Sequence, residues 1–326
     1  MLEVEGLAKT YKVINHEGIF RRRVKLVEAV KDVSITVKPG EIVGLLGVNG
    51  SGKTTTIKML SSMLYPTNGS YYLDQIDGIK HPLEIKKRIN LIVGGERNLY
   101  WQLSGKENLQ YFGALYNIPQ IELDKRIDFL LRLVKLNTVA NLPVESYSKG
   151  MKQRLQIIRG LINNPKYLFL DEPTIGLDIE IMQEMHQYIK QLSLENNKGL
   201  LITTHYIDEA EKLCDKIYIM DQGRTIKSGT PEEIILNANL QEKLILEIVD
   251  TDCISDRINM LFTNLDKKFN RHINWELKKS YLTLYLYKSE IVECIQYLIK
   301  TEYSVNGISV EKVKLEQALK TLIDHT

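Results

Sequence analysis

The sequence predicts an α/β protein in two parts, a large parallel sheet covered by helices and a smaller α+β domain after it. Short, nearly continuous apolar runs alternate with long helical patterns up to about Gly229, as in a parallel sheet buried on both faces. Beyond a polar stretch near residue 240, strands and helices follow in a different order. The length of 326 residues also exceeds the roughly 250–300 residues that one hydrophobic core usually fills.

Five apolar runs in the first part have the length and composition of buried strands. They are Ile42–Leu46, Ile89–Val93, Tyr167–Leu170, Leu200–Thr203 and Lys216–Met220. Longer patterns with helical periodicity lie between them, at Asp124–Leu136 and Ile179–Glu195. We therefore expect a parallel sheet with helices on its faces, and a helix-rich segment at about residues 100–165.

The second domain is expected to begin near residue 241. Thr230 and Pro231 form a typical helix start, an N-cap followed by proline at the first helical position, and polar Asn237–Glu242 has the composition of a linker. From Lys243 the pattern predicts strand, helix, two strands, helix and strand, and then a last helix. This order is that of the split βαβ, or ferredoxin-like, arrangement. The predicted domains are residues 1–240 and 241–326.

The composition is that of an ordinary globular protein, with 44% hydrophobic and 26% charged residues. Forty-three basic against 41 acidic residues give a net charge of +2, too small to indicate a nucleic-acid partner. No apolar run approaches the roughly 18 residues of a membrane helix, and the charged N-terminal residues do not resemble a secretory signal. Cys214, Cys253 and Cys294 have no metal-ligand spacing, which favours a reducing cytosol. Any membrane would be reached through a partner.

A glycine-rich loop follows the first buried strand. Residues 47–54 read Gly-Val-Asn-Gly-Ser-Gly-Lys-Thr and match the phosphate-binding pattern G-x-x-x-x-G-K-[ST] between a strand and a helix. Glycines let backbone N–H groups approach phosphate oxygens, and the helix N-terminus adds its dipole. Lys53 is expected to neutralise phosphate charge and Thr54 to bind Mg²⁺. The predicted nucleotide-binding residues are Gly47, Asn49, Gly50, Ser51, Gly52, Lys53, Thr54 and Thr55.

Two carboxylates end a later strand, in the sequence Lys166–Glu172. At the carboxyl edge of a parallel sheet such residues face the ligand crevice. Asp171 suits the coordination shell of Mg²⁺, and Glu172 is placed to act as general base on an attacking water. Without the phosphate loop, the same pair would be as easily explained as a solvated acidic turn before Pro173.

The segment Tyr147–Leu155 resembles the signature of the ATP-binding-cassette (ABC) family, which commonly reads Leu-Ser-Gly-Gly-(Gln or Met). Ser148 and Gly150 match, whereas Tyr147 replaces leucine and Lys149 replaces the first glycine. Ser148 has the features of an N-cap, so the helix after it would offer free N–H groups to an anion. The phosphate loop precedes this segment and the two carboxylates follow about 20 residues later. The resemblance covers roughly residues 1–235.

The resemblance implies roles for three further residues. Asp178 lies in Ile-Gly-Leu-Asp, which is similar to the D-loop at the contact between subunits. His205 ends a strand and looks like the switch histidine that senses the γ-phosphate, and we count it as catalytic with Glu172. Tyr11 matches the aromatic residue that stacks on adenine, the alternative being a half-buried strand tyrosine.

The sequence departs from the family pattern at two places. The glutamine that usually contacts Mg²⁺ and couples to the membrane partner is absent, and either Gly95 or Glu96 takes its position. Glu96 retains the ability to bind Mg²⁺ directly or through water. The stretch Lys12–Glu28 carries a net charge of +3 and is expected to be a solvated basic loop or a contact with anionic lipid or a partner near the membrane.

The resemblance implies a P-loop ABC-type nucleotide-binding domain with an α-helical signature subdomain. The expected function is the ATP-binding and ATP-hydrolysing subunit of an ABC transporter, with ATP and Mg²⁺ as cofactors. It would power export through a separate transmembrane permease subunit at the cytoplasmic face of the cell membrane, as in the drug-, sodium- or antibiotic-exporting branches. One copy of each motif implies a second ATPase subunit, in a homodimer or heterodimer. Ser148 of one subunit would close on phosphates held by Lys53 of the other.

A soluble ABC regulator of ribosomes or DNA is the competing hypothesis. Such proteins generally have two cassettes in one chain or long coiled-coil arms, and this sequence shows neither. The C-terminal domain is either a regulator that binds a small ligand or a dimerisation and packing element. The cargo is not encoded here, because its selection lies in the membrane subunit.

Overall fold

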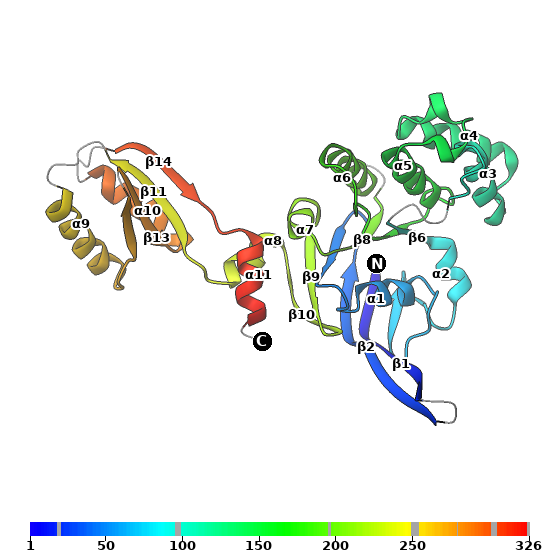
Figure 1. The fold of residues 1–326 in the computed structure, drawn as a ribbon, viewed down its shortest axis with the longest axis horizontal. Helices are drawn as coiled ribbons and strands as arrows, with labels where there is room; N and C mark the ends of the chain where they lie inside the picture. Colours follow the sequence, from blue (N-terminus) through cyan, green and yellow to red (C-terminus); the bar gives the residue numbers. More distant parts are fainter. Residues whose placement is uncertain are drawn as a thin grey trace. The chain divides into compact units, whose positions relative to one another are not determined.

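The computed structural model describes residues 1–17, 21–94, 99–194, 197–248, 254–278, 280–300 and 305–324. The chain divides into two compact units, Met1–Pro231 and Glu232–Thr326 (Figure 1). We call them the first unit and the second unit and describe each by itself. The division comes before the predicted boundary at residue 240, because helix α8 (Pro231–Asn237) groups with the second unit and not with the sheet that precedes it.

The first unit is built on a ten-stranded sheet with the order β5-β4-β1-β2-β10-β9-β3-β8-β7-β6. Its strands are β1 Leu2–Glu17, β2 Arg21–Val37, β3 Ile42–Leu46, β4 Asn68–Leu73, β5 Ile76–Asp77, β6 Ile89–Val93, β7 Tyr167–Asp171, β8 Gly199–Thr204, β9 Lys216–Asp221 and β10 Arg224–Gly229. Strands β9, β3, β8, β7 and β6 run parallel, and every residue of β3, β7 and β8 is buried. The predicted parallel sheet is confirmed.

Helices cover both faces of this sheet and form a separate cluster beyond β6. They are α1 Lys53–Leu60, α2 Pro82–Arg88, α3 Gly105–Leu115, α4 Gln120–Leu133, α5 Lys149–Gly160, α6 Ile179–Leu194 and α7 Ile207–Leu213. Helix α1 packs against β2 and β7, while α7 packs against β3 and β8. Helices α3, α4 and α5 pack on one another beyond the sheet edge, which confirms the helix-rich segment (Figure 1).

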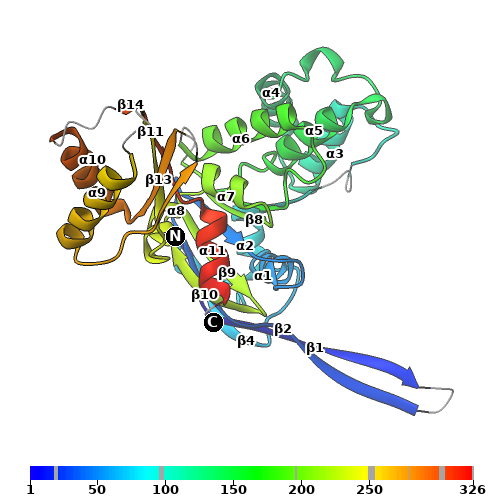
Figure 2. The ribbon, with the colours of Figure 1, turned by 60° about the vertical axis from the view of Figure 1, so that its left-hand side comes forward.

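The segment Lys12–Glu28, expected as a loop, is instead the outer part of a β-hairpin. Strands β1 and β2 pair from Tyr11 opposite Val27 to Glu17 opposite Arg21, and the ribbon extends away from the sheet (Figure 2). The loop prediction was wrong because it was based on the basic residues. The same stretch is also rich in β-branched residues, which favour strands. Contact with anionic lipid stays a prediction.

The second unit contains a four-stranded antiparallel sheet with the order β12-β13-β11-β14. Its elements are β11 Glu242–Ile248, α9 Ile254–Phe269, β12 Trp275–Lys278, β13 Tyr281–Leu286, α10 Lys288–Lys300, β14 Val305–Glu311 and α11 Leu315–Asp324. Leu244, Leu282 and Leu284 of the sheet form one buried cluster with Leu265 of α9 and Leu298 of α10. The element order and the strand order are those of the predicted split βαβ arrangement.

None of the helices within the described ranges combines the length and the apolar character that crossing a membrane requires.

A cluster of polar contacts at Asp74 joins the turn between β4 and β5 to the start of β7. The Asp74 carboxylate accepts hydrogen bonds from the Met1 amino group at 2.6 Å, from Lys166 Nζ at 2.7 Å and from the Tyr167 hydroxyl at 3.1 Å. Burial acts to raise the pKa of Asp74, but these donors outweigh it and lower the pKa to about 2. The charged carboxylate therefore stabilises this edge of the sheet.

Replacing Asp74 with asparagine should reduce the free energy of unfolding at pH 7 by about 1 kcal/mol, after allowance for solvent screening. Because the folded-state pKa of about 2 lies below the unfolded value of about 3.9, this contribution is present above about pH 4 and is lost as the pH falls toward 2. Urea denaturation of both proteins between pH 7 and pH 2 measures it. The exposed Asp128→Asn serves as the matched control, and equal pH profiles for Asp74→Asn and wild type would contradict the assignment.

Candidate active site

The glycine-rich loop connects the end of β3 to the start of α1, and its shape requires glycine. Gly52 caps α1 with a φ of +107°, which side-chain-bearing residues rarely adopt. A Cβ on Gly47 would lie 2.4 Å from the carbonyl oxygen of Met220, on neighbouring β9. The loop backbone is thereby held against the sheet edge, at the N-terminus of a helix, which is a ready site for an anion.

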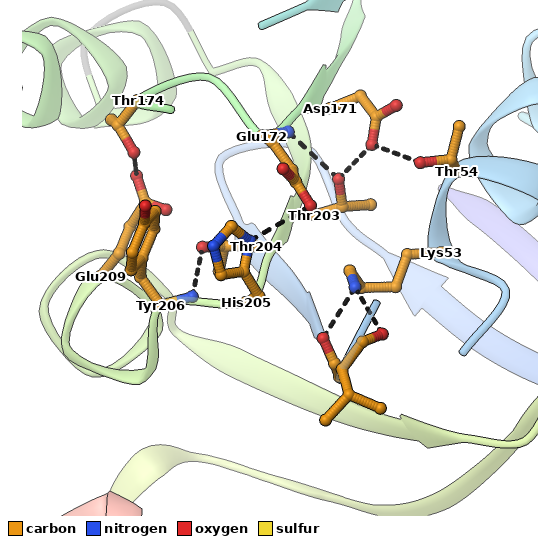
Figure 3. Close-up of polar contacts among 12 residues, drawn as sticks. Lys53, Thr54, Asp171, Glu172, Thr174, Thr203, Thr204, His205, Tyr206 and Glu209 are labelled. Carbon is orange, nitrogen blue, oxygen red and sulfur yellow. Dashed lines mark hydrogen bonds and ion pairs between the residues drawn. The ribbon is translucent and has the colours of Figure 1, made fainter. Parts of the chain in front are cut away.

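Lys53 is the first residue of α1 and is only 4% exposed. Its Nζ donates to the carbonyl oxygens of Gly47 at 2.7 Å and of Val48 at 3.1 Å (Figure 3). Burial lowers the pKa of Lys53, and the negative charges of Glu172 and Asp171 partly counteract this. Since an ammonium has three hydrogens and two are in use, one more acceptor can bind Lys53.

Ser51, inside the loop, is 2% exposed, and its hydroxyl has no protein partner in the described part of the chain. A buried hydroxyl without a partner is costly unless a ligand supplies one. The loop therefore has a buried cation and a buried hydroxyl, both suited to phosphate oxygens. Gly50 and Asn49 lie on the exposed side of the same loop, and Thr55 is half-buried in the first turn of α1.

Asp171 ends β7 and faces the phosphate loop. It is 7% exposed, and its Oδ1 accepts hydrogen bonds from the Thr54 hydroxyl at 3.2 Å and from the Thr203 hydroxyl (Figure 3). A carboxylate beside a threonine hydroxyl offers the oxygen ligands that Mg²⁺ prefers, with water and phosphate completing its shell. The described residues hold no cluster of three His, Cys, Asp or Glu side chains suited to a metal, so Mg²⁺ would need oxygen atoms from its substrate.

Glu172 follows Asp171 in a strained backbone conformation, with a φ of +50°. Its N–H is held by the carbonyl oxygen of Thr203 at 3.0 Å and by the hydroxyl of the same residue at 3.2 Å. Its Oε1 lies 3.2 Å from Nδ1 of His205, and both side chains are about a quarter exposed, at 23% and 28%. A carboxylate positioned by a neighbouring histidine and open to solvent is suited to accept a proton from water.

A buried contact holds the turn after Glu172 to the helix after His205. Thr174 donates its hydroxyl hydrogen to Oε1 of Glu209 in α7 at 2.7 Å (Figure 3). The same oxygen lies 3.2 Å from Nε2 of His186 in α6. This contact therefore joins the turn that follows Glu172 to helix α7, which follows His205.

The signature segment lies at the start of α5. Ser148 is exposed and caps this helix, its hydroxyl accepting from the N–H of Met151 at 3.3 Å. Gly150 is buried against Ile181 of α6. Gln153, one turn further along, donates to the carbonyl oxygen of Pro173 at 2.6 Å and so ties α5 to the turn that carries Glu172.

The structure brings together Lys53, Thr54, Asp171, Glu172 and His205 (Figure 3). It leaves others apart. Within the described ranges, no hydrogen bond or ion pair joins Ser148, Gly150 or Asp178 to this group, and Asp178 is exposed just before α6.

Among the described residues, no hydrogen bond or ion pair joins Tyr11 to this group. Tyr11 is half-buried on β1 opposite Val27, with the Lys9 ammonium 5.7 Å from its ring centroid. Gly95 and Glu96 both lie outside the described residues, so their competition for the glutamine position stays a prediction.

Sequence reasoning missed Thr203, which contacts both Asp171 and Glu172. Thr203 lies on β8, directly opposite Asp171 on the parallel neighbour β7. The only sequence signal is its place at the end of a buried strand, two residues before His205. That signal becomes informative once β7 and β8 are known to be adjacent.

A phosphate loop, a metal-suited Asp and a strained Glu at the ends of adjacent parallel strands define a P-loop nucleotide hydrolase. Comparison with known proteins specifies the family. The "ABC transporter" family model matches residues 30–175. The ABC transporter ATP-binding protein NatA of Bacillus subtilis is 41% identical over 215 residues, covering 66% of this chain and 87% of that protein.

Two further comparisons agree. The Nod factor export ATP-binding protein I of Ralstonia nicotianae is 38% identical over 232 residues, 71% of this chain and 70% of that protein. The dimeric post-hydrolysis structure of the ATP-binding cassette MJ0796, bound to ADP and Pi, covers 71% of this chain and 98% of that chain, with 27% identity and a TM-score of 0.61. The chain belongs to the ABC transporter family, in which it is an ATP-binding, ATP-hydrolysing subunit.

Thr203→Val should lower the ATPase rate by about 10- to 100-fold, because it removes a hydrogen bond to a buried carboxylate and one to the strained Glu172 backbone. The change keeps the β-branched shape, so the fold should persist. Steady-state ATPase rates at varied Mg²⁺ concentration measure the effect.

The matched control is Thr225→Val on β10, which makes the same change at a buried hydroxyl that has no hydrogen-bond partner among the described residues. We expect it to hydrolyse ATP at the wild-type rate. A Thr203→Val protein with normal rate and normal Mg²⁺ dependence would show that this threonine does not support the site.

Proposed function

We propose that this chain hydrolyses Mg²⁺–ATP to drive export of a cargo through a separate transmembrane permease subunit. The observation that carries the proposal is the position of Glu172 beside His205, at the end of the strand whose Asp171 contacts Thr54 of the phosphate loop. Export is supported by the similarity to a protein named for Nod factor export.

The phosphate loop would bind the β- and γ-phosphates of ATP through its backbone N–H groups, with Lys53 as the buried counter-charge. Thr54 and Asp171 would hold Mg²⁺, which when bound neutralises the charge that develops on the phosphate oxygens. Tyr11, whose ring is partly exposed, is proposed to stack on adenine.

Glu172 is the proposed general base. It accepts a proton from water while the water oxygen bonds to the γ-phosphorus, and the bond to the β–γ bridging oxygen breaks to give ADP and phosphate. His205, 3.2 Å from Glu172, orients this carboxylate and senses the γ-phosphate. Glu172 has a φ of +50°, and residues with such strained backbones cluster at functional sites.

A second ATPase subunit is proposed to complete the site. Ser148 at the exposed N-terminus of α5 and the exposed Asp178 form no hydrogen bond or ion pair with the phosphate site of their own chain in the part that the structure describes. An exposed helix N-terminus with a serine cap is suited to bind phosphate oxygens held by another subunit. The similarity to the MJ0796 cassette, whose structure is dimeric, supports a second subunit.

A cavity of about 310 Å³ beside β6 is the proposed contact for the transmembrane subunit at the cytoplasmic face of the membrane. Its lining includes Met63, Leu91, Val93 and Tyr116, with Lys86 and Arg159 at its polar side. Met63 is 66% exposed, so its apolar side chain is accessible to a partner. The cavity adjoins the end of β6, after which Gly95 and Glu96 follow.

Met63→Asp should detach the chain from the membrane fraction when it is co-expressed with its cognate membrane subunit, because a charge would have to be buried in the contact. Fractionation followed by immunodetection measures this. Leu142→Asp, at a 50% exposed leucine away from this cavity, is the control and should stay membrane-bound. Wild-type chain that remains in the soluble fraction with the membrane subunit present would instead favour a soluble regulator.

Glu172→Gln should bind ATP with normal affinity but hydrolyse it about 10²–10⁴ times more slowly, the usual contribution of a general base. It should also accumulate as an ATP-bound dimer, because closure no longer leads to product release. Single-turnover hydrolysis and size-exclusion chromatography with ATP measure both effects.

Three further variants bracket this result. Lys53→Ala should lose ATP binding itself, whereas Lys58→Ala, exposed on the same helix, should not. Glu211→Gln, at an exposed position of α7, should leave turnover unchanged. If Glu172→Gln turns over normally and stays monomeric with ATP, another group is the base.

A further inference from the structure

A cavity of the first unit lies outside the nucleotide site, between α4, α5 and α6. Its volume is about 540 Å³, within the range of small-molecule sites. Most of its wall is apolar, with Phe129 and Leu130 from α4, Ile157 from α5, and Tyr188 and Leu192 from α6. Phe129 is 62% exposed at the rim, while Leu130 and Leu192 are each 4% exposed.

Three cations also line this cavity, and of these Lys125 is exposed, whereas Arg126 is half-buried and Lys198 is buried. Lys198, which precedes β8, is 8% exposed, and its Nζ donates to Asn164 Oδ1 at 2.9 Å and to the Pro165 carbonyl oxygen at 2.6 Å. Arg126 of α4 donates from Nη1 to the Ile162 carbonyl oxygen at 3.0 Å. Arg126 and Lys198 thus both contact the turn that ends α5. Lys198 has one hydrogen left for another acceptor, and Arg126 has several.

The positive charges of Lys198 and Arg126 at this turn are poorly compensated by the described carboxylates. Across the described residues, no carboxylate lies within ion-pair distance of Lys198. Arg126 has Glu122 at 3.5 Å, but the Glu122 side chain is 59% exposed and so contributes little. Burial lowers the pKa of Lys198, and the nearby Arg126 lowers it further. An anion that entered the cavity would offset the cost of burying this ammonium.

We propose that this cavity binds one medium-chain carboxylate, its headgroup between Arg126 and Lys198 and its chain along Phe129, Leu130 and Leu192. The guanidinium of Arg126 suits the two oxygens of a carboxylate, and Lys198 supplies a point charge. The apolar walls disfavour sugars and nucleotides. The proposal concerns α4, α5 and α6 and does not rest on the proposed transport function.

Titration of the full chain with decanoate, below its micelle concentration and followed by calorimetry, tests the proposal. We expect one molecule per chain. Decanol, with the same chain and no charge, should bind at least about tenfold more weakly, since it cannot form the charge-assisted hydrogen bonds. Uptake of many molecules without saturation, or equal binding of decanol, would overturn the proposal.

Lys198→Met tests the headgroup contact, because it keeps an unbranched chain and removes the charge. Decanoate affinity should fall by about tenfold or more. Lys190→Met, the same change at an exposed position of α6 outside the cavity, should bind like wild type. Wild-type affinity in Lys198→Met would refute the assignment of the headgroup.

Loss of Lys198 also removes two hydrogen bonds within the fold, so a test on the unchanged protein is needed. A decanoate analogue with a photoreactive diazirine at the chain end should label peptides from residues 120–134 or 179–194. Mass spectrometry of the digested wild-type chain locates the label. Label confined to other peptides would overturn the proposal even if Lys198→Met were unstable.

Discussion

The hydrogen bonds of Thr203 hold the catalytic end of the first unit together. Its hydroxyl donates to Asp171, and its hydroxyl and carbonyl oxygens both accept from the N–H of Glu172. They form because β7 and β8 are parallel neighbours with Asp171 opposite Thr203. His205 comes two residues after Thr203, just beyond the end of β8, and contacts Glu172. The metal-suited carboxylate, the proposed base and its histidine partner therefore all depend on one strand pairing.

The same constraint places the phosphate loop. Strand β3 lies on the other side of β8, with Leu46 opposite Thr204, so the loop after β3 emerges beside the site. Neighbouring parallel strands present their carboxyl ends at one edge, where ligands of open α/β sheets bind. Lys53 is buried there beside Asp171 and Glu172, whose charges partly offset its desolvation. Among the described residues, buried Lys198 has only an amide and a carbonyl oxygen as acceptors, and this distinguishes the cavity between α4, α5 and α6 from the phosphate site.

The links between helices and the site extend this arrangement beyond the sheet. Gln153 ties the signature helix α5 to Pro173, and Glu209 ties α7 to Thr174. The turn after Glu172 is therefore held from two sides. A displacement of α5 would move the backbone next to the proposed base, which gives a physical route for events at Ser148 to reach Glu172. The second unit has its own buried core of helix and sheet residues and need not share this network.

The sequence by itself determined the features that depend on short spacing. Residues 47–54 specify a phosphate loop because glycines, Lys53 and Thr54 must follow one another between a strand and a helix. The split βαβ order of the second unit could also be predicted, because each strand and helix there has a clear hydrophobic periodicity. Tertiary structure decided what depends on strand order and packing: the contacts of Thr203, the hairpin at Lys12–Glu28, and the burial of Lys198 beside an apolar cavity. These features join residues distant in the chain, and no local pattern records which strands and helices will be neighbours.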